Sequence, residues 1–198
     1  MTEHLKNQII WDNFRQGSRD ALEWIYENNY ASLFQYARKF SKDSDLIKDL
    51  IQELFVELID SGSRLSTTNN IRFYLLKSLR NKLSKFFSKD LKLLGQLDDF
   101  TMFNLVDSIE NQLIKEEVEE QIQNQILNAL KKLSAKQQEI IYLRFYKGLS
   151  FNEIAEIFDV EIQTVRNLLN RAINSLKDDF QKSNITKSLI FFLLELSV

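Results

Sequence analysis

The 198-residue chain contains no proline and only four glycines. These two residues most often interrupt helices and form the tight turns between strands. A chain with so few of them is poorly suited to hairpins and well suited to long helices. The composition therefore predicts an all-α fold, and apolar residues that recur at helical spacing over long stretches agree with it.

Composition also excludes several classes of function. The chain has no cysteine, which rules out disulfides, thiolate metal sites and cysteine nucleophiles. Its single histidine, His4, lies near the terminus, where we expect it to be exposed to solvent. The sequence shows no Gly-rich phosphate loop, metal-ligand spacing or nucleophile–base pair. We therefore expect no catalytic activity, no metal and no cofactor.

The sequence predicts a cytoplasmic protein with no membrane insertion. It does not open with the basic segment and apolar core of a secretion signal. Its longest apolar run, residues 189–194, is far shorter than the roughly 20 residues that span a bilayer.

Hydrophobic periodicity predicts two small helical domains joined by an acidic linker. In the first domain, helices begin after Ser18, after the polar turn 41–45 and near Ile71. The middle one has a buried face that runs from Leu46 to Ile59. Opposite that face lies an acidic stripe with one apolar member: Asp45, Asp49, Gln52, Glu53, Val56 and Glu57. Because periodicity weakens between the domains, we predict a first domain at 1–94, a linker at 95–115, a second domain at 116–182 and an apolar tail at 183–198.

The net charge of −2 conceals two strongly charged segments. Residues 64–94 contain eight basic residues and one acidic residue, whereas residues 95–125 contain eight acidic residues and one basic residue. Such asymmetry suggests that the two segments meet different partners. On charge alone, two ordinary solvated helix faces remain an alternative.

Residues 133–177 carry the most specific local pattern, that of a helix-turn-helix. A helix from Ser134 ends at Gly148, which suits the left-handed conformation of a helix terminus. Ser150 and Glu153 have capping-box spacing, and Leu149 and Ile154 are spaced as a hydrophobic staple. The short helix 151–158 should bury Ile154, Ala155 and Phe158. A turn at 159–160 then precedes a longer helix with a core stripe at Val165, Leu169, Ile173 and Leu176.

The longer helix has a polar outward face near its start. Its members are Gln163, Thr164, Arg166, Asn167, Asn170 and Arg171. This is where a recognition helix meets base edges and phosphates in the major groove of DNA. The alternative is a helical hairpin in an ordinary bundle, but the small Ala155, the short turn and the polar cluster together favour DNA binding.

These motifs resemble the extracytoplasmic-function (ECF) group of the sigma-70 family, over most of residues 15–180. Residues 133–139 (LSAKQQE) and 142–150 (YLRFYKGLS) resemble the entry to the −35-reading domain of that family, and 153–157 (EIAEI) and 164–167 (TVRN) continue the match. Residues 49–55 (DLIQELF) are similar to its polymerase-clamp-binding helix, and 74–83 (YLLKSLRNKL) to its −10-reading helix. A helix-turn-helix alone is shared by many regulators, but both halves in this order make a specific pattern.

The resemblance implies a sigma factor that binds core RNA polymerase and directs promoter recognition, DNA melting and transcription initiation. It implies that Asp49, Gln52, Glu53 and Val56 dock on the polymerase clamp. It places a second set of residues along the −10 element: Arg72, Lys77, Arg80, Asn81 and Lys82. The loop 63–70 would hold an extruded base, and the acidic linker would thread the RNA channel of the polymerase.

Two departures from the family pattern suggest a further partner. The recognition helix has Leu168 where family members commonly place a basic residue, which leaves Arg166 and Arg171 as its only charges on that face. The tail at 183–198 is apolar and extends past the usual end; it packs on its own domain or docks in the groove of a partner. We therefore expect placement or restraint by an anti-sigma factor, an activator or an RNA-guided, nuclease-dead CRISPR effector. The alternative function is a stand-alone helix-turn-helix DNA-binding regulator.

Overall fold

A computed structural model describes residues 2–93, 102–106, 109 and 120–182 of the chain. All regular elements in these ranges are helices, which confirms the all-α prediction. The chain divides into two compact units, residues 1–100 and 101–198. Among the described helices, none combines the length and apolarity needed to cross a bilayer.

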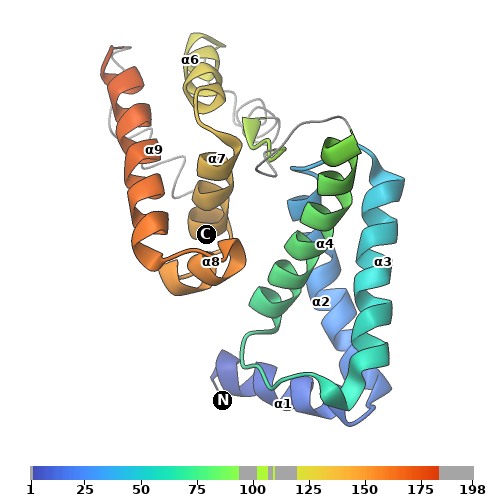
Figure 1. Cartoon of the computed structure of the whole chain (residues 1–198). Helices are drawn as coiled ribbons and strands as arrows, with labels where there is room; N and C mark the ends of the chain where they lie inside the picture. Colours follow the sequence, from blue (N-terminus) through green and yellow to red (C-terminus); the bar gives the residue numbers. More distant parts are fainter. Residues whose placement is uncertain (1, 94–101, 107–108, 110–119, 183–198) are drawn as a thin grey trace. The chain divides into compact units, whose positions relative to one another are not determined.

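The first unit consists of α1 (Glu3–Arg15), α2 (Arg19–Ala37), α3 (Ser44–Ser61), η1 (Gly62–Arg64) and α4 (Ile71–Leu93). In Figure 1, α2, α3 and α4 lie side by side and α1 crosses one end of them. Their interface is a continuous apolar core whose members are at most 1% exposed: Trp11, Ile25, Leu33, Ile47, Ile51, Leu75, Leu79 and Leu83. Burial on this scale is the main stabilising contribution to the unit.

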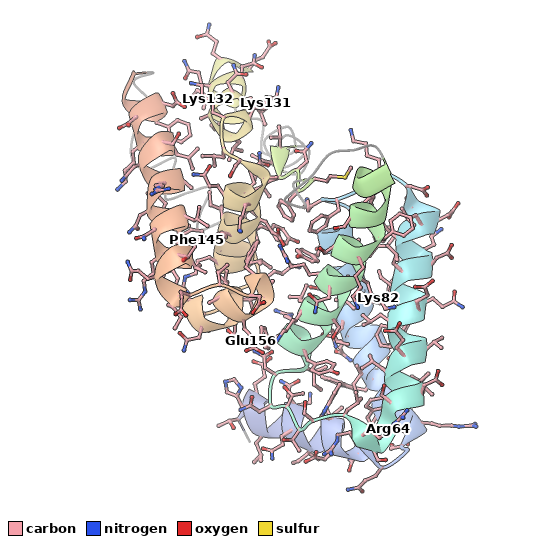
Figure 2. The ribbon with its side chains drawn as sticks, in the orientation of Figure 1. Arg64, Lys82, Lys131, Lys132, Phe145 and Glu156 are labelled. Carbon is pink, nitrogen blue, oxygen red and sulfur yellow. The ribbon has the colours of Figure 1, made fainter. Side chains whose placement is uncertain are left out.

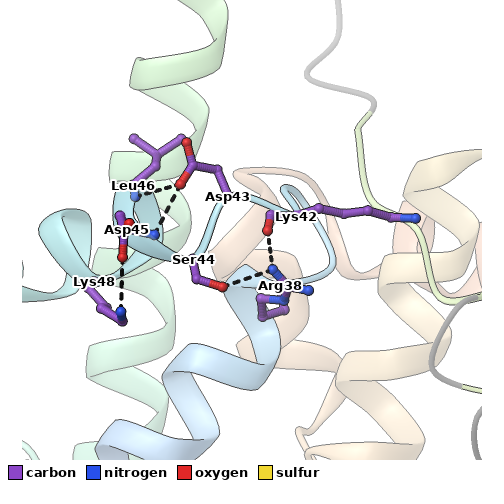
Figure 3. Close-up of polar contacts among 7 residues, drawn as sticks. All are labelled: Arg38, Lys42, Asp43, Ser44, Asp45, Leu46 and Lys48. Atoms are coloured by element: carbon purple, nitrogen blue, oxygen red, sulfur yellow. Dashed lines mark hydrogen bonds and ion pairs between the residues drawn. The ribbon is translucent and has the colours of Figure 1, made fainter.

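Side-chain caps define where these helices begin. The Ser18 hydroxyl accepts a hydrogen bond from the Ala21 amide, as the sequence predicts. The Asp43 carboxylate caps α3 by accepting from the amides of Asp45 and Leu46, at 3.0 and 3.1 Å (Figure 3). Beside this cap, Arg38 donates to the Lys42 carbonyl and to the Ser44 hydroxyl, which ties the end of α2 to the start of α3.

One residue of the predicted buried face of α3 is exposed. Ile59 was expected on the buried face of α3, but 52% of it is accessible to solvent. The buried stripe of α3 ends at Leu58. Ile59 lies roughly 80° around the helix from Ile51, at 3.6 residues per turn, and so faces the same side as Gln52.

The sequence did not predict α1. Only Trp11 and Phe14 of its 13 residues are buried, so its apolar periodicity is weak. His4 is exposed as expected, although it belongs to this helix and its Nδ1 atom lies 3.4 Å from the Asn69 carbonyl oxygen.

The second unit consists of α6 (Glu120–Lys131), α7 (Ala135–Ile141), the π-helix η2 (Tyr142–Tyr146), α8 (Phe151–Phe158) and α9 (Ile162–Lys182). Helix α9 packs against α6, α7 and α8. The core of the unit contains residues with no exposed surface: Ile126, Ile140, Leu143, Ile154, Val165 and Ala172.

The structure confirms the capping and the turn of the predicted helix-turn-helix, although the helix before it ends at Ile141 and continues as the π-helix η2. Gly148 has a φ of +66°, and Ser150 and Glu153 form a capping box at the start of α8. Asp159 adopts the left-handed conformation at the turn, with a φ of +52°. The prediction for Phe158 was wrong. Ile157 is buried at 3% exposed in its place, and Phe158, the last residue before the turn, is half-buried with the Lys136 ammonium over its ring.

Part of the predicted linker packs onto the second unit. Phe103, Leu105, Val106 and Ile109 are all buried. The Leu105 amide donates to the side-chain oxygen of Gln138, at 2.9 Å, and the Phe103 ring lies 5.6 Å from the ring of Tyr142. The predicted domain boundaries stay a prediction, and the tail at 183–198 lies outside the described residues.

Replacing Gly148 with alanine should destabilise the second unit. An added Cβ would meet no atom within 4 Å, so only backbone strain at positive φ opposes it. That strain costs about 1–2 kcal/mol for an ordinary L-residue. We expect urea unfolding of Gly148→Ala to show this loss, and Gly148→Asn to show a smaller one because asparagine tolerates the left-handed region better. Equal losses in both variants would contradict this explanation.

Candidate functional site

The exposed side of α3 brings the four predicted polymerase-binding residues together. Asp49, Gln52, Glu53 and Val56, together with Glu57, are all exposed and line one shallow, open depression. We call these five residues the α3 face. Val56, the apolar member of this face, is 48% exposed, and Ile59, one turn further along α3, is also exposed. Apolar side chains framed by carboxylates form a surface suited to a basic partner.

Lys82 joins the α3 face rather than the other predicted −10 residues. Its ammonium lies 2.6 Å from Glu57 Oε1 and 3.5 Å from Glu53 Oε2, and its side chain is only 13% exposed. Arg72 and Asn81 are exposed, whereas Lys77 and Arg80 are half-buried and make interactions of their own. At about 100° per residue, Lys82 points roughly 160° away from Arg80, toward α3. Figure 2 shows Lys82 on α4 at the side that faces α3.

Helix α1 braces the loop 63–70, which was predicted to hold an extruded base. The Trp11 indole donates to the Ser66 carbonyl at 2.9 Å, and Arg15 donates to the Ser63 carbonyl at 3.5 Å. At the end of the loop, the Asn70 side chain accepts from the Phe73 amide and so caps α4. The loop is therefore held between α1 and the start of α4.

All six residues of the predicted recognition face are exposed on the first half of α9: Gln163, Thr164, Arg166, Asn167, Asn170 and Arg171. Gln163 donates to the side-chain oxygen of Asn167 at 3.1 Å, so these two amides are ordered relative to each other. Leu168 is half-buried, and it does not belong to this face.

Sequence reasoning missed two residues beside this face. The ring of Phe151, at the start of α8, lies 4.8 Å from the guanidinium of Arg144 and 5.4 Å from that of Arg166. Arg144 also donates to the Leu149 carbonyl at 2.8 Å. Phe151 therefore orients two cations at once. No local signal reveals this cluster, because it joins η2, α8 and α9.

Among the described residues, no three or more histidines and carboxylates gather as they would around a metal ion. The described residues instead form two exposed surfaces. One is the acidic and apolar α3 face in the first unit, and the other is the polar face of the recognition helix α9 in the second unit. This combination defines a DNA-binding protein that also has a surface suited to a protein partner.

Comparison with known families agrees with this class. The family described as Sigma-70 region 2 matches residues 25–91, and Sigma-70, region 4 matches residues 129–178, together more than half of the chain. The chain therefore belongs to the sigma-70 family of RNA polymerase sigma factors, in its ECF group. Its function is to bind core RNA polymerase and to direct promoter recognition, DNA melting and transcription initiation. Matches to both halves favour this function over a stand-alone helix-turn-helix regulator.

Relatives of known function are similar over nearly their whole length. The RNA polymerase sigma factor YlaC of Bacillus subtilis is 25% identical over 83% of this chain and 95% of its own. The ECF RNA polymerase sigma-E factor of Haemophilus influenzae is 26% identical over 91% of this chain and 98% of its own.

Two solved structures share the fold. The structure of CnrH in complex with the cytosolic domain of CnrY matches with a TM-score of 0.59, at 18% identity over 89% of this chain and 97% of that one. The sigma factor RpoE in complex with the anti-sigma factor NepR from Bartonella quintana matches with a TM-score of 0.54, at 20% identity over 82% of this chain and 96% of that one.

Proposed function

We propose that the α3 face is the surface by which this sigma factor binds the clamp of core RNA polymerase. The observation that carries the proposal is the convergence of Asp49, Gln52, Glu53 and Val56 on one exposed depression. The carboxylates that line this depression attract a basic partner. The exposed Val56 provides apolar surface that the partner can bury. The protein acts in the cytoplasm, without catalytic chemistry or a cofactor.

In this proposal, α4 and the loop 63–70 contact the −10 element. Arg72, Lys77, Arg80 and Asn81 contact the backbone of the displaced strand, and the loop receives an extruded base. Lys82 was predicted to act with them, but its contacts with Glu53 and Glu57 favour a role in tuning the charge of the α3 face. In the same proposal, the acidic linker at 95–115 occupies the RNA channel of the polymerase.

Replacing Lys82 with methionine tests that role. Loss of one positive charge makes the α3 face more negative, so association with core polymerase should become about two- to threefold faster at low salt. Promoter melting should be unchanged. Lys85→Met is the matched control, because Lys85 is an exposed lysine of the same helix. Stopped-flow association and permanganate footprinting measure the two steps. Impaired melting with unchanged association would instead place Lys82 on DNA.

We further propose that α9 reads the −35 element through its six exposed polar residues. Arg166 and Arg171 are the only basic residues of that face, so phosphate contacts from α9 are few. The contacts of Arg144 and Arg166 with the Phe151 ring compensate in part for this small number of phosphate contacts. They hold two guanidinium groups, from η2 and α9, beside the recognition face.

Removing the ring of Phe151 should weaken −35 binding. A cation–π contact contributes about 0.5–1 kcal/mol, so loss of two contacts predicts roughly a five- to thirtyfold lower affinity of the holoenzyme for a −35-containing promoter. Phe151→Tyr keeps the ring and should bind like the parent protein. Affinity is measured by fluorescence anisotropy with matched promoters that contain or lack the −35 element. An equal loss on both promoters would show that Phe151 does not serve −35 recognition.

We also propose that a further protein restrains or places this sigma factor. The two similar structures are complexes: CnrH with the cytosolic domain of CnrY, and the sigma factor RpoE with the anti-sigma factor NepR. Because the recognition face of α9 has few basic residues, a partner that brings the sigma factor to DNA would add to its weak promoter binding. The partner is an anti-sigma factor, an activator or an RNA-guided, nuclease-dead CRISPR effector.

Transcription from a random promoter library by purified core enzyme tests the proposed function directly. With this protein added, RNA should start at discrete sites, and the enriched promoters should share −10 and −35 sequences. Gel filtration should show the protein with core polymerase. If a targeting partner is supplied and neither a complex nor start-specific RNA forms, the proposed function is wrong.

A further inference from the structure

The second unit contains an apolar pocket that its DNA-reading face does not use. It is lined from α6, α7, η2 and α9, by residues that include Ile126, Leu130, Ile141, Phe145, Ile173 and Phe180. Leu105 and Ile109 close another part of its wall. Tyr146 also lines the pocket, and burial raises the pKa of its hydroxyl group to about 12.

The chain passes this pocket just before the tail begins. Phe180 lines the pocket, and α9 ends two residues later at Lys182. From Lys182 to Leu189 the chain can extend up to about 25 Å, at roughly 3.5 Å per residue. Apolar residues of the tail can therefore reach back to the pocket of their own unit.

The tail has the pattern that such a pocket requires. Ile185, Leu189, Phe192 and Leu196 recur at the spacing of one face of a helix. Lys187 and Glu195 are the only charged residues in 183–198. Left in water, a stretch of this composition is an aggregation hazard, whereas burial of its apolar stripe is favourable.

We propose that residues 185–196 dock in cis over this apolar pocket, through the stripe Ile185, Leu189, Phe192 and Leu196. Attachment through Lys182 gives the tail an effective concentration of about millimolar at the pocket, which favours it over a free partner helix. The inference concerns the second unit alone and does not depend on the proposed function.

The absence of cysteine allows a clean crosslinking test in the full-length chain, since introduced cysteines are its only thiols. Phe192→Cys is combined either with Phe145→Cys, at the pocket, or with Glu156→Cys, an exposed position on α8 (Figure 2). Under mild oxidation, the Phe145 pair should form an intramolecular disulfide at least about tenfold faster than the Glu156 pair, as a docked tail raises the local thiol concentration. Ile173→Cys replaces Phe145→Cys if circular dichroism shows that the latter does not fold.

A second change separates docking from random collision. Leu189→Asp, added to the Phe145 pair, should slow the crosslink at least about fivefold because it charges the buried stripe, whereas Ser188→Asp should leave the rate unchanged. Equal rates for the pocket and α8 positions, or no effect of Leu189→Asp, would overturn the proposal. Disulfides between chains would also overturn it, and would assign the pocket to a second copy.

Discussion

Asp49→Arg is expected to weaken binding of this sigma factor to core RNA polymerase by about 10- to 100-fold. Asp49 is exposed at the edge of the α3 face, so its charge can change without loss of core packing. Reversing a charge that faces an opposite charge removes one attraction and adds one repulsion, and close pairs across interfaces contribute about 1.5 kcal/mol or more each. Surface plasmon resonance against immobilised core enzyme measures the change.

Glu156→Arg provides the matched control for Asp49→Arg. It makes the same change of charge at an exposed position on α8 of the other unit. This variant should bind core polymerase within about twofold of the parent, because long-range charge alone is screened at physiological salt. If both variants lose affinity equally, the effect belongs to net charge and the α3 face is not the binding surface.

Trp11→Ala should cost the first unit about 3–5 kcal/mol of stability, the range for removal of a buried large aromatic side chain. Trp11 has no exposed surface, and its ring contacts those of Phe14 and Tyr74 at 5.4 and 4.8 Å. Its indole also holds the loop 63–70 through Ser66. Thermal unfolding measures the loss of stability.

Trp11→Phe separates the hydrogen bond from the packing. It keeps much of the ring volume and removes the indole donor to the Ser66 carbonyl, at a cost of about 0.5–1.5 kcal/mol because the exposed Ser66 can bond to water instead. We expect promoter opening to fall while association with core polymerase is kept, since the α3 face is intact. Promoter opening equal to that of the parent would show that the brace from α1 does not serve the loop.

The features that sequence analysis predicted depend on neighbours along the chain. The capping box of Ser150 and Glu153 and the left-handed Gly148 follow from residues within one turn of each other, and the structure has both. The α3 face followed from one helical period, which is why its members converge as expected. Ile59 was misplaced because it lies at the edge of that period.

What sequence analysis missed depends on contacts between distant elements. Lys82 and Glu57 are 25 residues apart, and no local pattern pairs them. Trp11 and Ser66 are 55 residues apart, so no local pattern predicts the hydrogen bond by which α1 holds the loop 63–70. With only two buried residues, α1 itself also has little apolar periodicity. The arrangement of Arg144, Phe151 and Arg166 likewise requires three elements to be packed first.

The wide turn of η2 gives two adjacent residues separate tasks. Arg144 rests on Phe151 beside the recognition helix, and Phe145 lines the apolar pocket. One peptide bond therefore connects the side of the second unit that carries the polar face of α9 with its apolar interior. The π-helix therefore fixes the position of the Arg144 guanidinium beside α9 and the packing of Phe145 in the pocket within the same turn.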